Sequence, residues 1–279
     1  MPLATLADIL RAANREGRAI AGLVCLGWED ALAYKLAAED VGAPVILQVG
    51  PGARAHMPLR VWGPMLRSLG EAASVPVVVH LDHGKAEDEC REALDCGFTS
   101  VMFDGSALPL AENVARTHAV CAEAKARGAS CEGEIGFVGY AQGERASEVS
   151  NPTEPGEAAE IAAVSGIDAL AVSVGNVHLK TTSDAVIDWD AVDAIAARVD
   201  APLVMHGASG VAPADRRRLA RGPFAKFNVG TELRQVFGAA LRETLEASPG
   251  RFDRVAILRE TVEPIRAAAR RVIGELYLP

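Results

Sequence analysis

The chain alternates short apolar runs with longer stretches in which apolar residues recur at helical spacing. The short runs are almost continuously apolar, which is typical of strands that are covered on both faces of a parallel sheet. Small turn motifs such as "VGAP", "ASVP" and "VDAP" precede many of them, where a helix would end and the chain would re-enter the sheet. The predicted strands lie at residues 19–26, 44–50, 76–82, 100–106, 130–136, 169–175, 202–208 and 224–230.

Eight strand-then-helix units within about 250 residues are what a (β/α)8 barrel needs. We therefore predict an α/β chain that forms a single TIM barrel domain over residues 1–279. A leading helix at about residues 5–15 and a C-terminal helical extension from residue 253 to about 276 are additions to the barrel. The alternative is an open doubly wound sheet, but "VCLGWED" after the first strand is not the glycine-rich turn of that fold.

Ionisable residues stand late in the predicted strands, and the chemistry of a TIM barrel lies at the carboxyl ends of its strands. The run "PVVVHLDHG" ends in Asp82 and His83, His178 follows the sixth strand, and His206 ends the seventh. Three neutral imidazoles that converge from different strands would form a catalytic zinc site with one position open. His80 shares the face of Asp82 by strand alternation, so we expect it to support ligands or to pack.

Composition and charge argue against a nucleic-acid-binding protein and against a membrane protein. A hydrophobic content of 49% is ample for a core, and a net charge of −9 argues against a nucleic-acid partner. No segment approaches the roughly 18 apolar residues of a membrane span, and the first residues do not read as a signal peptide. We therefore expect a cytoplasmic protein without a membrane partner. Five scattered cysteines without a C-x-x-C motif indicate reduced, buried thiols.

An ordered series of motifs resembles the class II ketose-bisphosphate aldolases, particularly their tagatose-bisphosphate branch. The resemblance spans about residues 5–245 and implies a TIM barrel, a homodimer or homotetramer, and one catalytic Zn²⁺ ion per chain. The motifs are "HLDHG", "SVMFDGS", "CEGEIGFVG", "GIDALAVSVGNVH", "PLVMHGASGV" and "KFNVGTEL".

Carried over motif by motif, the resemblance assigns a role to individual residues. His83, His178 and His206 would bind zinc, with Glu134 beside the metal as an alternative ligand or a supporting group. Asp82 would be the catalytic acid/base. The phosphorylated ketone half of the substrate would be held by Gly207, Ser209, Asn228 and Thr231.

The implied reaction is the reversible cleavage of a ketose phosphate, or a related hydroxy-ketone, into a ketone phosphate such as dihydroxyacetone phosphate and an aldehyde. Zinc would stabilise the enediolate, and Asp82 would take the C4 hydroxyl proton. A Schiff-base route through Lys180 or Lys226, which lie near the barrel mouth, is the competing chemistry. That route would not require the three histidines.

Several departures from the family pattern concern the substrate. Leu179 follows the second histidine where glycine is common, and Gly230 stands where fructose-specific members carry aspartate. We therefore predict poor activity on fructose 1,6-bisphosphate. The residue that protonates the enediolate is open, with Glu144 as a candidate. The other departures are Cys25, Gly50 and Tyr140.

Two other functions stay open from the sequence. A three-histidine metal could activate water in a barrel hydrolase, although the H-x-H pair expected on the first strand is absent. Leu179 and the altered loop at residues 140–151 would also suit a sugar-phosphate-binding protein that has lost catalysis.

Overall fold

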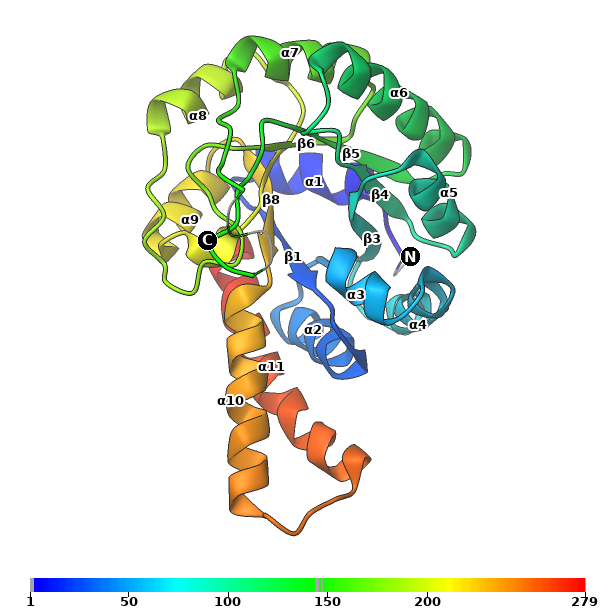
Figure 1. The fold of residues 1–279 in the computed structure, drawn as a ribbon, viewed down its shortest axis with the longest axis vertical. Helices are drawn as coiled ribbons and strands as arrows, with labels where there is room; N and C mark the ends of the chain where they lie inside the picture. Colours follow the sequence, from blue (N-terminus) through cyan, green and yellow to red (C-terminus); the bar gives the residue numbers. More distant parts are fainter. Residues whose placement is uncertain (1–2, 144–145, 147, 279) are drawn as a thin grey trace.

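The computed structural model describes residues 3–143, 146 and 148–278, and its parallel strands close into a barrel in sequence order (Figure 1). The predicted TIM barrel is confirmed, and every strand overlaps its predicted run. β3 alone runs past its predicted end, by two residues. The strands are β1 (Ile20–Val24), β2 (Val45–Val49), β3 (Val77–Gly84), β4 (Ser100–Phe103), β5 (Ser130–Ile135), β6 (Ala169–Val172), β7 (Leu203–Met205) and β8 (Phe224–Val229).

Helices surround the barrel, and both predicted additions are present. Thr5 caps the leading helix through a capping box with Asp8, and Asp253 caps the C-terminal helix. The helices are α1 (Leu6–Arg15), α2 (Trp28–Val41), α3 (Pro51–His56), α4 (Leu59–Glu71), α5 (Glu87–Asp95), α6 (Leu110–Ala126), α7 (Pro155–Val164), α8 (Trp189–Ala196), η1 (Ala208–Gly210), α9 (Pro213–Ala220), α10 (Thr231–Ala247) and α11 (Arg254–Tyr277).

The amino-terminal end of the barrel is filled by apolar side chains. Leu6 and Leu10 of α1 are fully buried and pack in one cluster with Ile20, Ile46 and Val78 from three strands. Each such side chain contributes about 1.5–3 kcal/mol by leaving water. Because α1 fills this end, a substrate can enter only at the opposite mouth, where the strands have their carboxyl ends.

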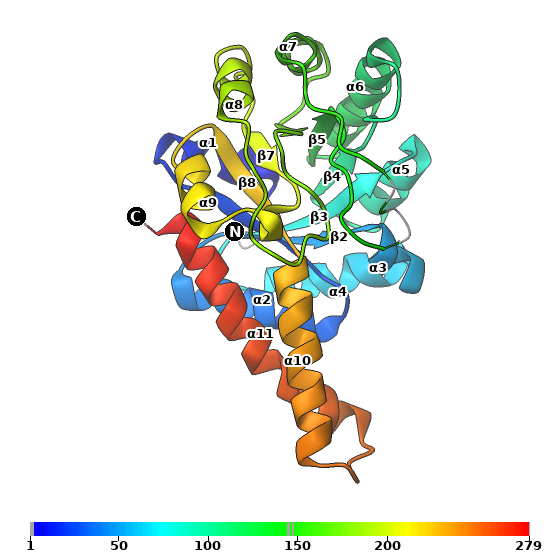
Figure 2. The same ribbon diagram turned by 60° about the vertical axis from the view of Figure 1, so that its left-hand side comes forward.

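Helices α10 and α11 form a hairpin that extends well beyond the barrel (Figures 1 and 2). Helix α11 then returns along α2 to the barrel, where the Leu276 carbonyl accepts a hydrogen bond from Ala19 N at 3.0 Å. None of the helices in the described residues combines the length and the apolar character that crossing a bilayer requires.

Candidate active site

A bulge at the end of β3 turns two consecutive side chains toward the barrel mouth. Strand alternation would send Asp82 and His83 to opposite faces, but the pairing of β3 with β4 shifts register between Leu81 and Gly84, and His83 has φ +53°. The Arg54 guanidinium holds this backbone, because it donates to the carbonyls of Asp82 at 2.8 Å and His83 at 2.7 Å. The strained conformation is therefore fixed by its surroundings.

The three predicted histidines come together at this mouth. His206 Nδ1 lies 3.0 Å from His83 Nε2, and ring nitrogens of His83, His178 and His206 all lie within 4.8 Å of one another. Zn–N bonds of about 2.0–2.1 Å in a tetrahedron would hold ligand nitrogens about 3.4 Å apart. His178 Nε2 is buried and has no hydrogen-bond partner in the described residues. The donor set therefore fits a divalent metal ion.

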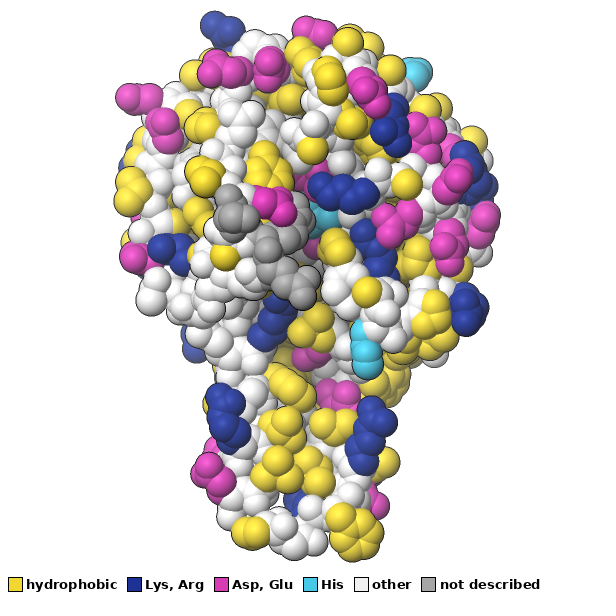
Figure 3. Space-filling view, in the orientation of Figure 1, with side chains coloured by type: hydrophobic (Ala, Val, Ile, Leu, Met, Phe, Trp, Pro, Cys, Tyr) yellow, Lys and Arg dark blue, Asp and Glu magenta, His cyan; other side chains and the backbone are white. Residues whose placement is uncertain are grey.

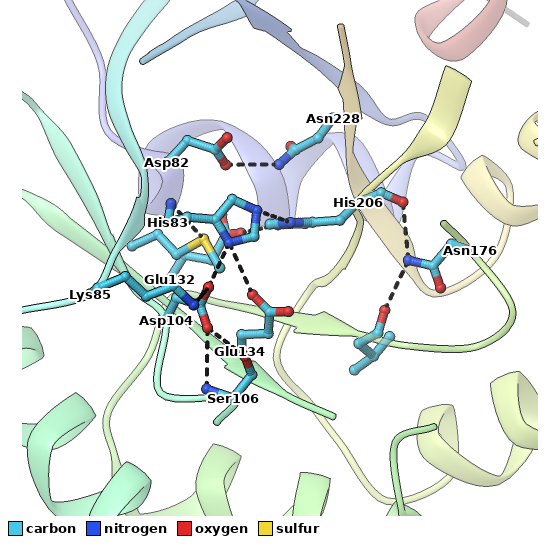
Figure 4. A network of polar contacts seen from close by, with 12 residues as sticks. Asp82, His83, Lys85, Asp104, Ser106, Glu132, Glu134, Asn176, His206 and Asn228 are labelled. Atoms are coloured by element: carbon cyan, nitrogen blue, oxygen red, sulfur yellow. Dashed lines mark hydrogen bonds and ion pairs between the residues drawn. The ribbon is translucent and has the colours of Figure 1, made fainter. Parts of the chain in front are cut away.

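Carboxylates behind two of the imidazoles determine which nitrogens face inward (Figure 4). His83 Nδ1 lies 2.8 Å from Asp104 Oδ2, and His206 Nε2 lies 3.0 Å from Glu132 Oε1. An ionised carboxylate only accepts, so these outer nitrogens carry the protons. His83 Nε2 and His206 Nδ1 keep their lone pairs for a shared ligand, as metal-binding histidines do.

The surroundings shift the pKa values of the three imidazole rings in different directions. Burial lowers the pKa values of His178 and His206 well below the usual range, and the neighbouring His83 lowers them further. Burial also opposes protonation of His83, but Asp82, Asp104 and Glu134 outweigh it and raise the pKa of His83 well above its usual value. Among the three rings, His83 is therefore the one whose surroundings favour a proton on Nε2 when no metal is bound, and a metal would replace that proton.

Glu134 lies beside the histidines, where it was predicted. Its Oε2 atom is 3.4 Å from His83 Nδ1 and has no hydrogen-bond partner in the described residues. Burial and the nearby Asp104 raise the pKa of Glu134 to about 7. His83, Asp104 and Glu134 form a second group whose ligand atoms lie within 4.8 Å of one another. Glu134 could therefore serve as an alternative ligand.

A fully buried polar layer lies beneath the histidines. Lys226 Nζ donates to Glu132 Oε2 at 2.6 Å and lies 3.2 Å from His80 Nε2, while His80 Nδ1 lies 2.8 Å from Ser100 Oγ. Burial and the Lys226 charge lower the pKa of His80 well below its usual range. The supporting role expected of His80 is consistent with this layer. The expectation that Lys226 lies near the mouth is wrong, because it is 0% exposed and Glu132 binds it inside the barrel.

A cavity of about 400 Å³ opens above the histidines. Asp82 and Asn228 meet in its wall, with Asn228 Nδ2 donating to Asp82 Oδ1 at 3.1 Å. Burial would raise the pKa of Asp82, but His83, His206 and Lys226 together lower it, so the carboxylate is ionised. The cavity is lined by Asp82, His83, His178, Gly207, Ser209, Asn228 and Thr231 among the predicted residues, whereas Glu134 and His206 lie outside this lining.

Gln48 also lines the cavity and was not predicted. Its side chain is 0% exposed, and both its amide oxygen and its nitrogen lack partners in the described residues. Buried amides are normally satisfied, which points to a ligand group here. The sequence signal was available, since Gln48 is the single polar residue of the apolar run "VILQV".

The predicted phosphate side has two residues in left-handed backbone conformation. Gly207 has φ +62°, and a Cβ there would lie 2.4 Å from the Val177 carbonyl oxygen, so only glycine fits. Leu179 has φ +56°, a conformation that favours glycine, and its carbonyl accepts from Gln142 Nε2 at 3.0 Å. The backbone at Leu179 therefore has the conformation that a glycine would adopt, and the departure from the family pattern is confined to the Leu179 side chain.

Other residues singled out in the sequence fall around the cavity. The Tyr140 ring stacks on His178 with centroids 4.8 Å apart, and Lys180 pairs with Asp184 at 3.0 Å. Cys25 is buried and does not line the cavity, while Gly50 does. Glu144, the candidate for protonating the intermediate, lies outside the described residues.

A closed parallel barrel with three convergent imidazoles and an adjacent carboxylate at its carboxyl-terminal mouth defines a metal-dependent barrel enzyme. Comparison with known proteins gives the particular family. Residues 4–277 match the family model described as "Fructose-bisphosphate aldolase class-II", and the chain belongs to that family. It is a class II aldolase, so the predicted family and enzyme class are confirmed.

Relatives match along nearly the whole chain. The chain is 32% identical to the fructose-bisphosphate aldolase of Staphylococcus aureus strain Mu50, over 99% of this chain and 97% of the relative. It is also 32% identical to the 6-phospho-5-dehydro-2-deoxy-D-gluconate aldolase of Shouchella clausii, over 99% and 94%. The crystal structure of the YdjI aldolase from Escherichia coli K12 superposes with a TM-score of 0.86 at 28% identity, covering 98% of this chain and 97% of that one.

Proposed function

We propose that the chain reversibly cleaves a ketose phosphate into a ketone phosphate and an aldehyde, with Asp82 as the acid/base. The observation that carries this proposal is the convergence of three imidazoles beside the Asp82 carboxylate at one cavity. We take the whole chain, residues 1–279, as one domain for this reaction, because the strands of one closed barrel run from residue 20 to residue 229 and the family match covers residues 4–277.

His83, His178 and His206 would hold one Zn²⁺ ion per chain, with Glu134 as the alternative ligand. A bound divalent cation polarises a ketone oxygen and stabilises the negative charge that develops when the carbon–carbon bond breaks. The chain contributes a prearranged donor set, since Asp104 and Glu132 already orient two of the rings.

Asp82 would accept the proton of the C4 hydroxyl as the C3–C4 bond breaks, and would return it in condensation. Its ionised state suits a base, and Asn228 holds one of its oxygens. The other oxygen faces Gly50, where even a Cβ would lie only 3.4 Å from Asp82 Oδ2. Gly50 therefore leaves room for a substrate hydroxyl next to the acid/base.

Gly207, Ser209, Asn228 and Thr231 would bind the phosphorylated ketone end, and Gln48 would bind a substrate hydroxyl. Leu179 lines the same cavity, and its side chain would take up space that glycine leaves free. We therefore propose a substrate other than fructose 1,6-bisphosphate, with tagatose 1,6-bisphosphate as the first to test. The relatives support a substrate other than fructose 1,6-bisphosphate, because their names include aldolases for different sugar phosphates.

We further propose a cytoplasmic homodimer or homotetramer. The α10–α11 hairpin exposes apolar side chains, including Phe252 and Val255 at 91% and 65% exposure, and Figure 3 shows this apolar surface along the hairpin. Patches of this kind mark association sites. Light scattering on the purified protein should give a dimer or larger, and a monomer at working concentrations would contradict the proposal.

The decisive experiment combines metal analysis with turnover of a panel of ketose phosphates. We expect about one divalent ion per chain and cleavage to an aldehyde, detected by coupled oxidation or reduction of the products. Hydrolysis of phosphate or ester bonds without carbon–carbon cleavage would favour the barrel hydrolase. Tight binding of a ketose phosphate without turnover would favour a sugar-phosphate-binding protein that has lost catalysis.

A further inference from the structure

The three imidazoles of the cluster differ in what lies behind them. His83 Nδ1 faces Asp104 at 2.8 Å, and His206 Nε2 faces Glu132 at 3.0 Å (Figure 4). In the described part of the chain, no carboxylate lies within ion-pair distance of the His178 ring. A different kind of group must therefore orient the third imidazole.

An aromatic ring covers one face of the His178 imidazole. Tyr140, in the loop after β5, stacks on it with ring centroids 4.8 Å apart and planes inclined by 25°. Tyr140 is half-buried in the cavity wall, and the Phe137 ring packs against it with centroids 6.4 Å apart. The stack restricts rotation of the imidazole, because a turned ring would lose this contact.

The backbone holds the two rings opposite each other. Tyr140 and His178 are partners in an isolated parallel bridge. His178 N donates to the Gly139 carbonyl at 2.8 Å, and Ala141 N donates to the His178 carbonyl at 2.9 Å. Bridge partners send their side chains to the same face. A side chain at position 140 therefore lies against the imidazole at position 178.

The stack leaves one nitrogen of His178 available to a ligand. His178 Nε2 is buried and has no hydrogen-bond partner in the described residues. The centroid of the His178 ring lies 5.1 Å from that of His83 and 5.6 Å from that of His206. Rotation of the ring would move Nε2 relative to the other two imidazoles, so the stack fixes the direction of the third donor.

We propose that Tyr140 is the positioning residue of His178, and that its ring takes the place of the carboxylate that orients each of the other two histidines. This inference rests on the proposed function, because it treats the three histidines as ligands of one divalent ion. A carboxylate partner also raises the basicity of a histidine ligand, whereas a neutral ring only orients it. Tyr140 is a position at which the chain departs from the family pattern, so this support is a feature of this chain.

The first test measures zinc affinity by competition with a chromophoric chelator. Tyr140→Leu removes the ring but keeps an apolar side chain, and it should weaken zinc binding about 2- to 13-fold, as for the loss of one aromatic pair. Tyr140→Phe keeps the ring and should bind zinc as the wild type does. Tyr277→Leu is the matched control, because Tyr277 packs at the amino-terminal end of the barrel, and it should also keep the wild-type affinity.

The second test separates positioning from a general loosening of the loop. Co²⁺ bound in place of zinc reports the geometry of its ligands through its visible absorption bands. At full occupancy, Tyr140→Leu should alter these bands, while Tyr140→Phe should reproduce the wild-type spectrum. The proposal is overturned if either the zinc affinity or the cobalt spectrum of Tyr140→Leu matches the wild type, or if Tyr140→Phe loses as much as Tyr140→Leu.

Metal-free protein with isotopically labelled histidine distinguishes this inference from the proposed function. The ring current of residue 140 should displace the NMR resonances of the His178 imidazole in the wild type and in Tyr140→Phe, but not in Tyr140→Leu. If the wild type binds neither zinc nor cobalt, the proposed metal site fails, and this measurement alone decides whether Tyr140 orients His178. Identical His178 resonances in the wild type and in Tyr140→Leu would refute that role.

Discussion

Replacing Lys226 with methionine tests whether the buried polar layer stabilises the fold and positions the proposed metal ligand His206. The Lys226 ammonium and the Glu132 carboxylate are both 0% exposed and lie 2.6 Å apart, and Glu132 in turn accepts from His206 Nε2. Methionine fills similar space without the charge. It would leave a buried carboxylate whose remaining contacts are imidazoles.

Removing one partner of a buried ion pair costs about 3–5 kcal/mol, because the other charge stays desolvated. At about 2–4 °C per kcal/mol for a chain of this size, the melting temperature should fall by about 6–20 °C. Without Lys226, the Glu132 carboxylate would also change its hydrogen bond with His206 Nε2 and with it the orientation of that ring. We therefore expect metal affinity to fall about 10- to 100-fold, as when other supporting partners of metal ligands are removed.

The assay is thermal unfolding with and without metal, together with competition for zinc by a chelator. Lys180→Met is the matched control, because Lys180 pairs with Asp184 at the surface, where such a pair contributes at most about 1 kcal/mol. Adding Glu132→Gln to Lys226→Met removes the orphaned charge and should restore part of the stability. Wild-type stability and metal affinity in Lys226→Met would refute the reasoning. In the wild-type protein, a covalent substrate adduct that is trapped at Lys226 by chemical reduction would instead support the Schiff-base route.

The remaining predictions concern the cavity itself. Asp82→Asn should keep the fold and metal while retro-aldol turnover falls about 10²- to 10⁴-fold, and near-normal kcat would assign the proton to another residue. His206→Ala should lose the bound ion in elemental analysis, and full retention would exclude it as a ligand. Leu179→Gly should raise kcat/KM on fructose 1,6-bisphosphate, and a wild-type value already in the ordinary range of about 10⁴–10⁸ M⁻¹s⁻¹ would contradict the substrate assignment. Gly207→Ala should destabilise the protein by about 2–4 kcal/mol in denaturant unfolding, because its Cβ would meet the Val177 carbonyl, and an unchanged midpoint would disprove this clash.

The fold could be predicted because a parallel barrel buries both faces of every strand. Runs such as "PVILQVG" and "ALAVSVG" must then be apolar throughout, and their number and spacing define the barrel. The three histidines could be predicted for a related reason. The carboxyl ends of all strands meet at one mouth, so His83, His178 and His206 converge although they are far apart in sequence.

Other parts of the site could not be predicted, because they depend on contacts that strand periodicity does not encode. The pairing of Glu132 with Lys226 joins residues 94 positions apart inside the barrel, and it requires the actual registers of β5 and β8. Arg54 lies on a short helix that no periodic signal distinguishes, yet it holds the backbone of Asp82 and His83.

Backbone strain is concentrated at the predicted metal ligands. Among the described residues, the non-glycine positions with positive φ are His83 and Leu179, which are a histidine of the cluster and the neighbour of another. Each costs about 1–2 kcal/mol, which persists only where the surroundings enforce it. Arg54 enforces the first through the His83 carbonyl, and Gln142 holds the second through the Leu179 carbonyl. Folding thus stabilises these two strained residues and positions the imidazoles of His83 and His178 before a ligand binds. Such preorganisation would let a bound metal and the Asp82 base act on the same substrate.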